Sequence, residues 1–121
     1  MNKTRNLLAS GTLIGDKVVN QENEHIGKIE ELMISVSDGN VAYAVMSFGG
    51  FLHFGDKFFA IPWSTLRVDE EKKRIVLNVD KERLKNAPGF DKNNWPDMTD
   101  ERFTTEINTY YKFTPKEEIL K

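Results

Sequence analysis

Apolar and polar positions alternate in short runs along the first part of the chain, which is the pattern of β-strands. Turn-forming residues separate the runs at intervals of roughly ten residues, a spacing typical of a small barrel or sandwich. The run at residues 41–48 is apolar on both faces, which predicts a central strand or one that is covered on both sides. We expect strands at residues 17–19, 26–36, 41–48, 57–61, 66–68 and 74–79.

The turn Ser37-Asp38-Gly39-Asn40 lies between two of these runs and predicts a β-hairpin. Asp-Gly between β-forming residues is the strongest short-range hairpin signal, because glycine accepts the backbone angles that a tight turn requires. The alternation within residues 26–36 is imperfect, and a helix over residues 28–33 is the alternative. The adjoining hairpin signal favours the strand.

Beyond residue 80 the spacing becomes helical. Residues 81–87 predict a short helix that Pro88-Gly89 ends. A longer helix is predicted over residues 99–111, where four apolar side chains recur at i, i+4, i+7 and i+8: Phe103, Ile107, Tyr110 and Tyr111. We expect this stripe to pack on the barrel or on a neighbouring subunit. The chain then divides into a polar leader at residues 1–12, a barrel at 13–91 and a helical extension at 92–121.

Composition and charge narrow the classes of function. With 17 Lys and Arg against 19 Asp and Glu, the net charge is -2, and the two signs are interspersed. The chain therefore has no strong field for nucleic acid, and we expect no nucleic-acid partner. The absence of cysteine excludes disulfides, thiol catalysis and Cys-ligated zinc, and fits a cytoplasmic protein. No apolar run approaches the roughly 18 residues of a membrane span.

No motif predicts a reaction centre, so we expect no catalytic residue, no cofactor and no metal. The segment at residues 50–57 resembles a phosphate-binding loop superficially, but Asp56 stands where that loop needs lysine. His25 and His53 lack companions at the spacing of metal ligands. The abundant carboxylates lie in charge-rich stretches that indicate a solvated surface, and no serine lies in a GxSxG pattern.

Aromatic side chains are concentrated between Phe48 and Trp63, a window that holds six of the chain's aromatic residues. Much of it reads as strand, but three large apolar residues in the connection Phe51-Leu52-His53-Phe54 are unusual, because loops normally face water. Such a loop either closes a barrel end or forms a patch that meets another subunit. Our candidate interface therefore combines this loop with the helix stripe: Phe51, Leu52, His53, Phe54, Phe103, Ile107 and Tyr110.

Four segments are informative together: Ile26-Gly27-Lys28-Ile29, the run at residues 41–48, Phe59-Ala60-Ile61-Pro62-Trp63 and Ala87-Pro88-Gly89-Phe90. They resemble a PRC-barrel domain, the domain of the H subunit of purple-bacterial photosynthetic reaction centres. The C-terminal part of the chain resembles that of stand-alone bacterial members of the family, which have a C-terminal helical extension. The resemblance implies a mainly β fold, a small barrel of about six short antiparallel strands, followed by an α-helical extension.

The resemblance implies less about function, because a fold alone does not define one. The reaction-centre domain covers a membrane complex, and a related barrel in a bacterial ribosome-maturation factor docks onto a ribosomal protein. The two share docking to proteins, and the family has no catalytic residue set that could be carried over.

Three hypotheses of function follow from the sequence. The first is a non-catalytic interaction module whose partner is a second copy of itself or another protein. The second is a barrel that binds a small ligand or ion, or a weak enzyme, with His53, Asp56 and Trp63 near its mouth. The third is a ribosome- or RNA-associated factor, which the net charge of -2 opposes.

Overall fold

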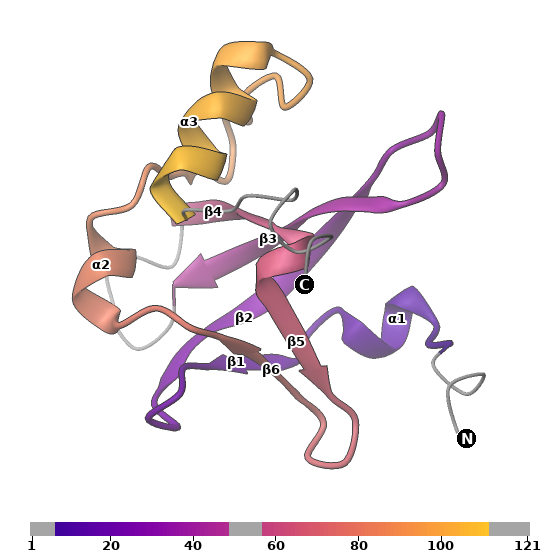
Figure 1. Cartoon of the computed structure of the whole chain (residues 1–121), viewed down its shortest axis with the longest axis vertical. Helices are drawn as coiled ribbons and strands as arrows, with labels where there is room; N and C mark the ends of the chain where they lie inside the picture. Colours follow the sequence, from indigo (N-terminus) through magenta and orange to yellow (C-terminus); the bar gives the residue numbers. More distant parts are fainter. Residues whose placement is uncertain (1–6, 49–56, 112–121) are drawn as a thin grey trace, which may run out of the picture.

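One curled β-sheet of seven strands forms the body of the computed structural model, which describes residues 7–48 and 57–111. The strand order is β5-β6-β1-β2-β3-β4-β7 (Figure 1). The strands are β1 (Lys17–Val19), β2 (His25–Ile34), β3 (Val41–Phe48), β4 (Lys57–Pro62), β5 (Leu66–Asp69), β6 (Arg74–Leu77) and β7 (Phe90–Asp91). The helices are α1 (Ser10–Leu13), the 3-10 turn η3 (Trp63–Thr65), α2 (Lys81–Lys85) and α3 (Glu101–Tyr111).

The mainly β barrel-like fold with a C-terminal helix is confirmed, and each predicted strand is present with small shifts at its ends. Three details differ from the sequence-based expectation. The two-residue strand β7 lies outside every predicted strand, and the four-residue helix α1 begins within the predicted leader. The pairing of β1 with β6 is parallel, so the sheet is not wholly antiparallel. Turn spacing reports only neighbours in sequence, whereas β1 and β6 are brought together by the curl of the sheet.

The β2–β3 hairpin confirms the Asp-Gly signal. Gly39 has φ +79°, a conformation in the left-handed region that glycine adopts without cost. The Ser35 N–H donates to the Asn40 carbonyl at 2.7 Å, and the Gly39 N–H donates to the Ser35 carbonyl at 2.7 Å. Strand β2 therefore ends at Ile34, two residues before the predicted end, and Val36 lies in the turn.

The main core lies inside the curl of the sheet. Its largest fully buried side chains include Phe59, Ile26, Ile29, Met46 and Ile61. Gly27 has a packing reason to lack a side chain, since a Cβ there would lie 2.5 Å from the Ser47 carbonyl oxygen. The close approach of β2 to β3 therefore depends on glycine at this position.

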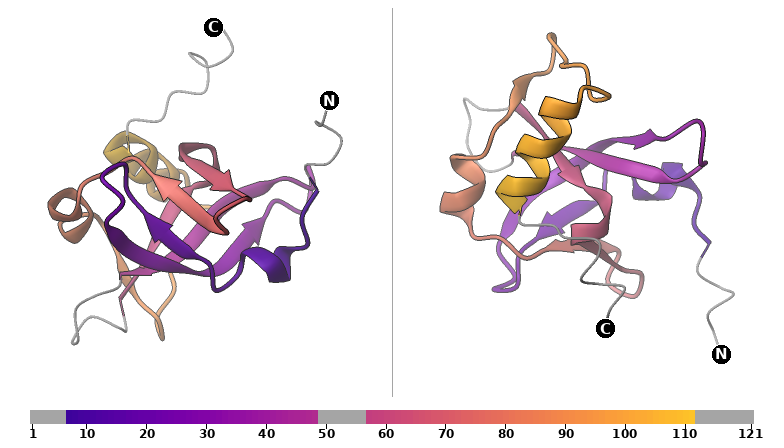
Figure 2. Two further views of the ribbon diagram at one scale, coloured as in Figure 1. Left: turned by 90° about the horizontal axis from the view of Figure 1, so that it is seen from below. Right: turned by 45° about the horizontal axis from the view of Figure 1, so that its top comes forward.

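A second, smaller core lies on the outer face of the sheet, where α3 packs across β4 (Figure 2). Ile107 is its centre, 1% exposed, against Tyr43 and Ala60. The ring of Phe103 meets the ring of Tyr43 edge-on at 5.9 Å between centroids. The apolar side of helix α3 thus attaches the helix to the sheet, and α3 forms a wall beside the sheet.

Helix α2 fastens the end of α3. Asp80 caps α2 by accepting a hydrogen bond from the Arg83 N–H at 2.8 Å. The Arg83 guanidinium lies over the Tyr110 ring, 4.2 Å from its centroid, and donates to the Tyr110 carbonyl. In return the Tyr110 hydroxyl donates to the Arg83 carbonyl at 2.5 Å. The two helices are therefore joined by reciprocal hydrogen bonds.

Candidate functional site

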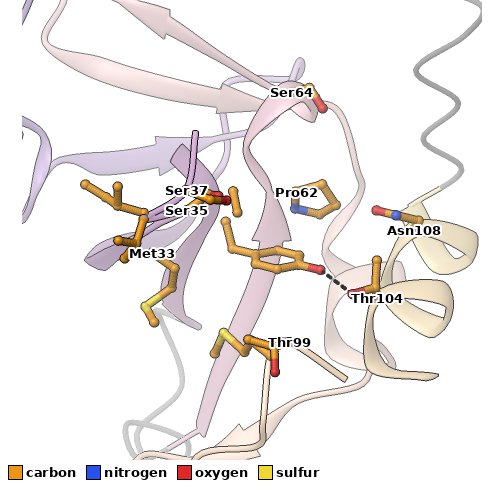
Figure 3. Close-up of a pocket in the computed structure, with 13 residues that line it drawn as sticks. Met33, Ser35, Ser37, Pro62, Ser64, Thr99, Thr104 and Asn108 are labelled. Carbon is orange, nitrogen blue, oxygen red and sulfur yellow. Dashed lines mark hydrogen bonds between the residues drawn. The ribbon is translucent and has the colours of Figure 1, made fainter. Parts of the chain in front are cut away.

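An open apolar groove of about 750 Å³ lies between the end of the β2–β3 hairpin and helix α3 (Figure 3). Met33 and Ile34 from β2, Tyr43 from β3 and Met98 before α3 supply apolar surface. Serine, threonine and asparagine side chains supply the polar groups of the lining: Ser35, Ser37, Ser64, Thr99, Thr104 and Asn108. Among the described residues, no lysine, arginine, aspartate or glutamate lines the groove, in a chain of which 30% is charged.

The hairpin forms one side of the groove and extends beyond the neighbouring strands (Figure 1). Its apolar residues face solvent, with Val36 94% exposed and Ile34 54% exposed. Apolar side chains at the end of this hairpin therefore contact water. Monomeric proteins rarely expose apolar surface in contiguous patches. The exposed hairpin end and the groove beside it therefore form one continuous surface, which we call the arm–groove surface: Met33, Ile34, Val36, Tyr43, Met98 and Asn108.

Helix α3 forms the opposite wall and presents polar groups to the groove (Figure 3). The Tyr43 hydroxyl donates to Thr104 Oγ1 at 3.4 Å, and the Thr104 hydroxyl donates to the Asp100 carbonyl at 3.3 Å. The Asn108 amide has no side-chain hydrogen bond within the described residues. An amide both donates and accepts, so Asn108 is suited to bind a backbone peptide group of a partner.

A second apolar groove, of about 640 Å³, lies on the other side of the same hairpin. Leu7, Leu8 and Leu13 line it from the N-terminal segment, Trp63 lines it from η3, and Val68 lines it from β5. Ile34 lines both grooves, so the end of the β2–β3 hairpin is bordered by apolar surface on each side.

The sequence-predicted interface residues have different positions. Phe51, Leu52, His53 and Phe54 lie outside the described residues, as does Asp56. Phe103 and Tyr110 are half-buried and Ile107 is fully buried, all three on the side of α3 that faces the body of the same chain. Their role between subunits stays a prediction.

The described residues contain no group of three or more histidine or acidic side chains that could hold a metal ion. His25 contacts its own strand, with Nε2 3.0 Å from the Gly27 carbonyl oxygen, and Trp63 lies half-buried against the main core. Across residues 7–48 and 57–111, no helix has both the length and the apolar character to cross a membrane.

Sequence reasoning did not single out Ile34, Val36, Met98 or Asn108. Ile34 and Val36 belong to the predicted strand at residues 26–36, and the apolar residues of such a strand are expected to face the core. A usable signal was their position immediately before the Asp-Gly turn, because a hairpin end can project beyond the elements that would cover it.

The family model of the PRC-barrel domain matches residues 6–84, which include strands β1 to β6 and therefore both strands of the β2–β3 hairpin. No curated protein matches the chain.

Proposed function

The chain belongs to the PRC-barrel family, and we propose that it is a non-catalytic protein-interaction module that self-associates through the arm–groove surface. The observation that carries this proposal is an uncharged groove beside the exposed side chains of Ile34 and Val36. The cores of protein interfaces are depleted of charged residues, as this surface is. The proposal places the protein in the cytoplasm, in keeping with a chain that has no cysteine.

A second copy of the chain is the partner that this surface suits best. A two-fold interface uses the same patch on both subunits, so the patch must contain both a projection and a recess. Here the exposed Val36 is the projection, and the groove floored by Tyr43 is the recess. Because no ionic side chain in the described part of the chain lines the groove, two copies can meet there without repulsion between like charges.

The oligomeric state tests the proposal. Light scattering after size exclusion is expected to give a dimer whose dissociation constant rises by at least about tenfold in Val36→Asp, because a carboxylate would be desolvated on association. Leu7→Asp is the matched control, since Leu7 is 87% exposed but lines the other groove. A strict monomer at high micromolar concentration, or equal weakening by both substitutions, contradicts the proposal.

The loop Phe51-Leu52-His53-Phe54 is tested in the same assay. Phe51→Asp and Phe54→Asp weaken association if this loop is part of the contact, and leave it unchanged if the arm–groove surface is sufficient. Comparing Val36→Asp with the two loop substitutions shows whether self-association uses the arm–groove surface or the loop at residues 51–54.

A small apolar ligand is the second candidate occupant, because the groove volume of about 750 Å³ lies within the range of ligand pockets. Native mass spectrometry of the protein purified from its own host tests this alternative. A stoichiometric bound molecule, lost in Met33→Asp, supports ligand binding in place of self-association.

A further inference from the structure

Positively charged side chains meet on the outer face of the sheet, where strands β6, β1 and β2 lie side by side. In the β-ladder Lys17 of β1 lies directly opposite Lys28 of β2 and directly beside Arg74 of β6. Like charges at directly paired positions destabilise a sheet. Three cations lie in one row, in register on adjacent strands, and the position opposite Arg74 on β5 is the anion Asp69.

These cations lie on the outer face of the sheet. Successive side chains of a strand point to opposite faces, and the neighbours Val18 and Ile75 are fully buried in the main core. Lys17 and Lys28 are correspondingly exposed, and Arg74 is partly exposed. Arg67 of β5 pairs with Val76, so it lies on the same face of the sheet, diagonal to Arg74.

A polar pocket of about 310 Å³ lies at the β5–β6 end of this row. Arg67 and Arg74 line it together with the amide side chains of Asn20, Gln21 and Asn23, and no carboxylate of residues 7–48 and 57–111 lines it. Amides and guanidinium groups are hydrogen-bond donors. The pocket therefore combines positive charge with several donors in a volume suited to a compact anion.

The walls of the pocket are held in place by hydrogen bonds. Asn20 is 2% exposed, and its Oδ1 accepts from the Glu22 and Glu24 N–H groups at 3.0 Å and 2.9 Å. Asn23 lies at φ +65°, and its Oδ1 accepts a hydrogen bond from the Arg74 guanidinium. The guanidinium is thus fixed before any ligand arrives, which lowers the entropy cost of binding.

Carboxylates near the row neutralise only part of its charge. Asp69 Oδ2 lies 3.3 Å from Arg74 Nε, and Glu30 Oε2 lies 3.9 Å from Lys28 Nζ. Glu24 accepts a hydrogen bond from Asn20 Nδ2 at 2.8 Å and does not line the pocket. Lys17 and Arg67 form no ion pair with any described residue.

We propose that this pocket binds a phosphate group, with Arg67 and Arg74 as its direct ligands and Lys17 as an additional positive charge beside it. The planar guanidinium matches the oxygens of a phosphate through paired hydrogen bonds, and these are among the stronger contacts in proteins. The phosphate is either a free ion or a group carried by a larger molecule. This site is independent of self-association, because none of its residues lines the arm–groove surface.

Nuclear magnetic resonance titration of the full chain with sodium tripolyphosphate, at constant ionic strength, tests the proposal. Saturable shifts are expected at the backbone amides of Asn20, Asn23, Arg67 and Arg74. Arg67→Gln is expected to weaken binding by about tenfold or more, since it removes charge-assisted hydrogen bonds. Arg67 is exposed, so this substitution leaves the fold intact.

Arg102→Gln is the matched control, because the Arg102 side chain is 92% exposed on α3, which contributes no residue to the pocket. Equal affinity of Arg67→Gln and the unmodified chain, or non-saturating shifts, overturns the proposal. Hexaglutamate that binds as tightly as tripolyphosphate also overturns it, because the pocket then responds to charge alone.

Two further arms identify the source of the phosphate. Inorganic phosphate tests the free ion, and co-sedimentation with phosphatidylcholine vesicles, with and without phosphatidylglycerol, tests a lipid-borne phosphate. Binding in either arm that Arg67→Gln abolishes supports the site, and binding in neither arm, together with no response to tripolyphosphate, refutes it.

Discussion

Replacing Tyr111 by phenylalanine is expected to stabilise the protein. The Tyr111 hydroxyl is buried and has no hydrogen-bond partner among the described residues, although its ring packs against both cores. A buried polar group without a partner costs about 1–3 kcal/mol relative to its hydrated state. Phenylalanine keeps the packed ring and removes this cost, so the free energy of unfolding should rise by about 1 kcal/mol or more.

Urea denaturation at neutral pH measures the difference, with an unchanged slope showing that only stability has changed. Tyr110→Phe is the matched control on the neighbouring residue, since the Tyr110 hydroxyl donates to the Arg83 carbonyl at 2.5 Å. Losing that bond should lower stability by about 1 kcal/mol. Opposite signs for two identical chemical changes are therefore expected. Destabilisation by Tyr111→Phe would show that its hydroxyl is hydrogen-bonded and would refute the reasoning.

The same hydroxyl predicts an alkaline effect. Burial raises the pKa of Tyr111 above the ordinary value of 10.0, the nearby Tyr110 raises it further, and the charge of Arg83 opposes the shift. Above pH 10 the unfolded chain loses the phenol proton while the native protein keeps it, so the free energy of unfolding falls as pH rises. Tyr111→Phe should lose less stability than the unmodified chain between pH 9 and pH 11, by roughly 1 kcal/mol. Parallel pH profiles would contradict this explanation.

Three further substitutions test the packing. Gly27→Ala should destabilise by more than about 2 kcal/mol in urea, because the new Cβ would lie 2.5 Å from the Ser47 carbonyl oxygen. Ile107→Ala should cost about 2–5 kcal/mol and speed hydrogen exchange in α3, because Ile107 centres the smaller core. Asn20→Ala should lower the thermal midpoint by an amount equivalent to about 1–3 kcal/mol, because its side chain makes the hydrogen bonds that hold residues 20–24.

Each of these has a control in the same chain. Gly11→Ala introduces a Cβ that meets nothing within 4 Å, so it should be nearly neutral. Glu106→Ala removes an exposed side chain from the same helix as Ile107. Gln21→Ala removes an exposed side chain from the same turn and should cost less than Asn20→Ala. If a control matches its test variant in cost, the assigned contact is not what stabilises that part of the fold.

Local patterns in the sequence were sufficient to predict most elements. The Asp38-Gly39 pair predicts the hairpin, and the structure places Gly39 at a positive φ in that turn. The spacing of Phe103 and Ile107 predicts a helix with one apolar side, and α3 buries that side. Alternation and turn chemistry act over a few residues, so they can be read without the fold. The parallel pairing of β1 with β6 could not be read, since it joins distant segments.

The sequence predicted the candidate sites less completely than the fold. Val36 reads as a strand residue, and its exposure of 94% results from a hairpin that extends beyond the elements able to cover it. The loop at residues 51–54 lies outside the described residues, so its predicted interface role awaits the association assay. Burial is a property of neighbours in space, and a periodic pattern reports only which face a residue occupies.

The sequence by itself determined the class of this protein. Short alternating runs, an Asp-Gly turn and one helical stripe specify a curled sheet with a C-terminal helix, because these signals arise from local backbone and side-chain preferences. Only the tertiary structure determined which side chains lie together in the candidate sites. Charges that are interspersed along the chain, among them Lys17 and Arg74, become neighbours through the strand register. The apolar groove exists because α3 packs beside a projecting hairpin, and that placement depends on contacts between residues far apart in sequence.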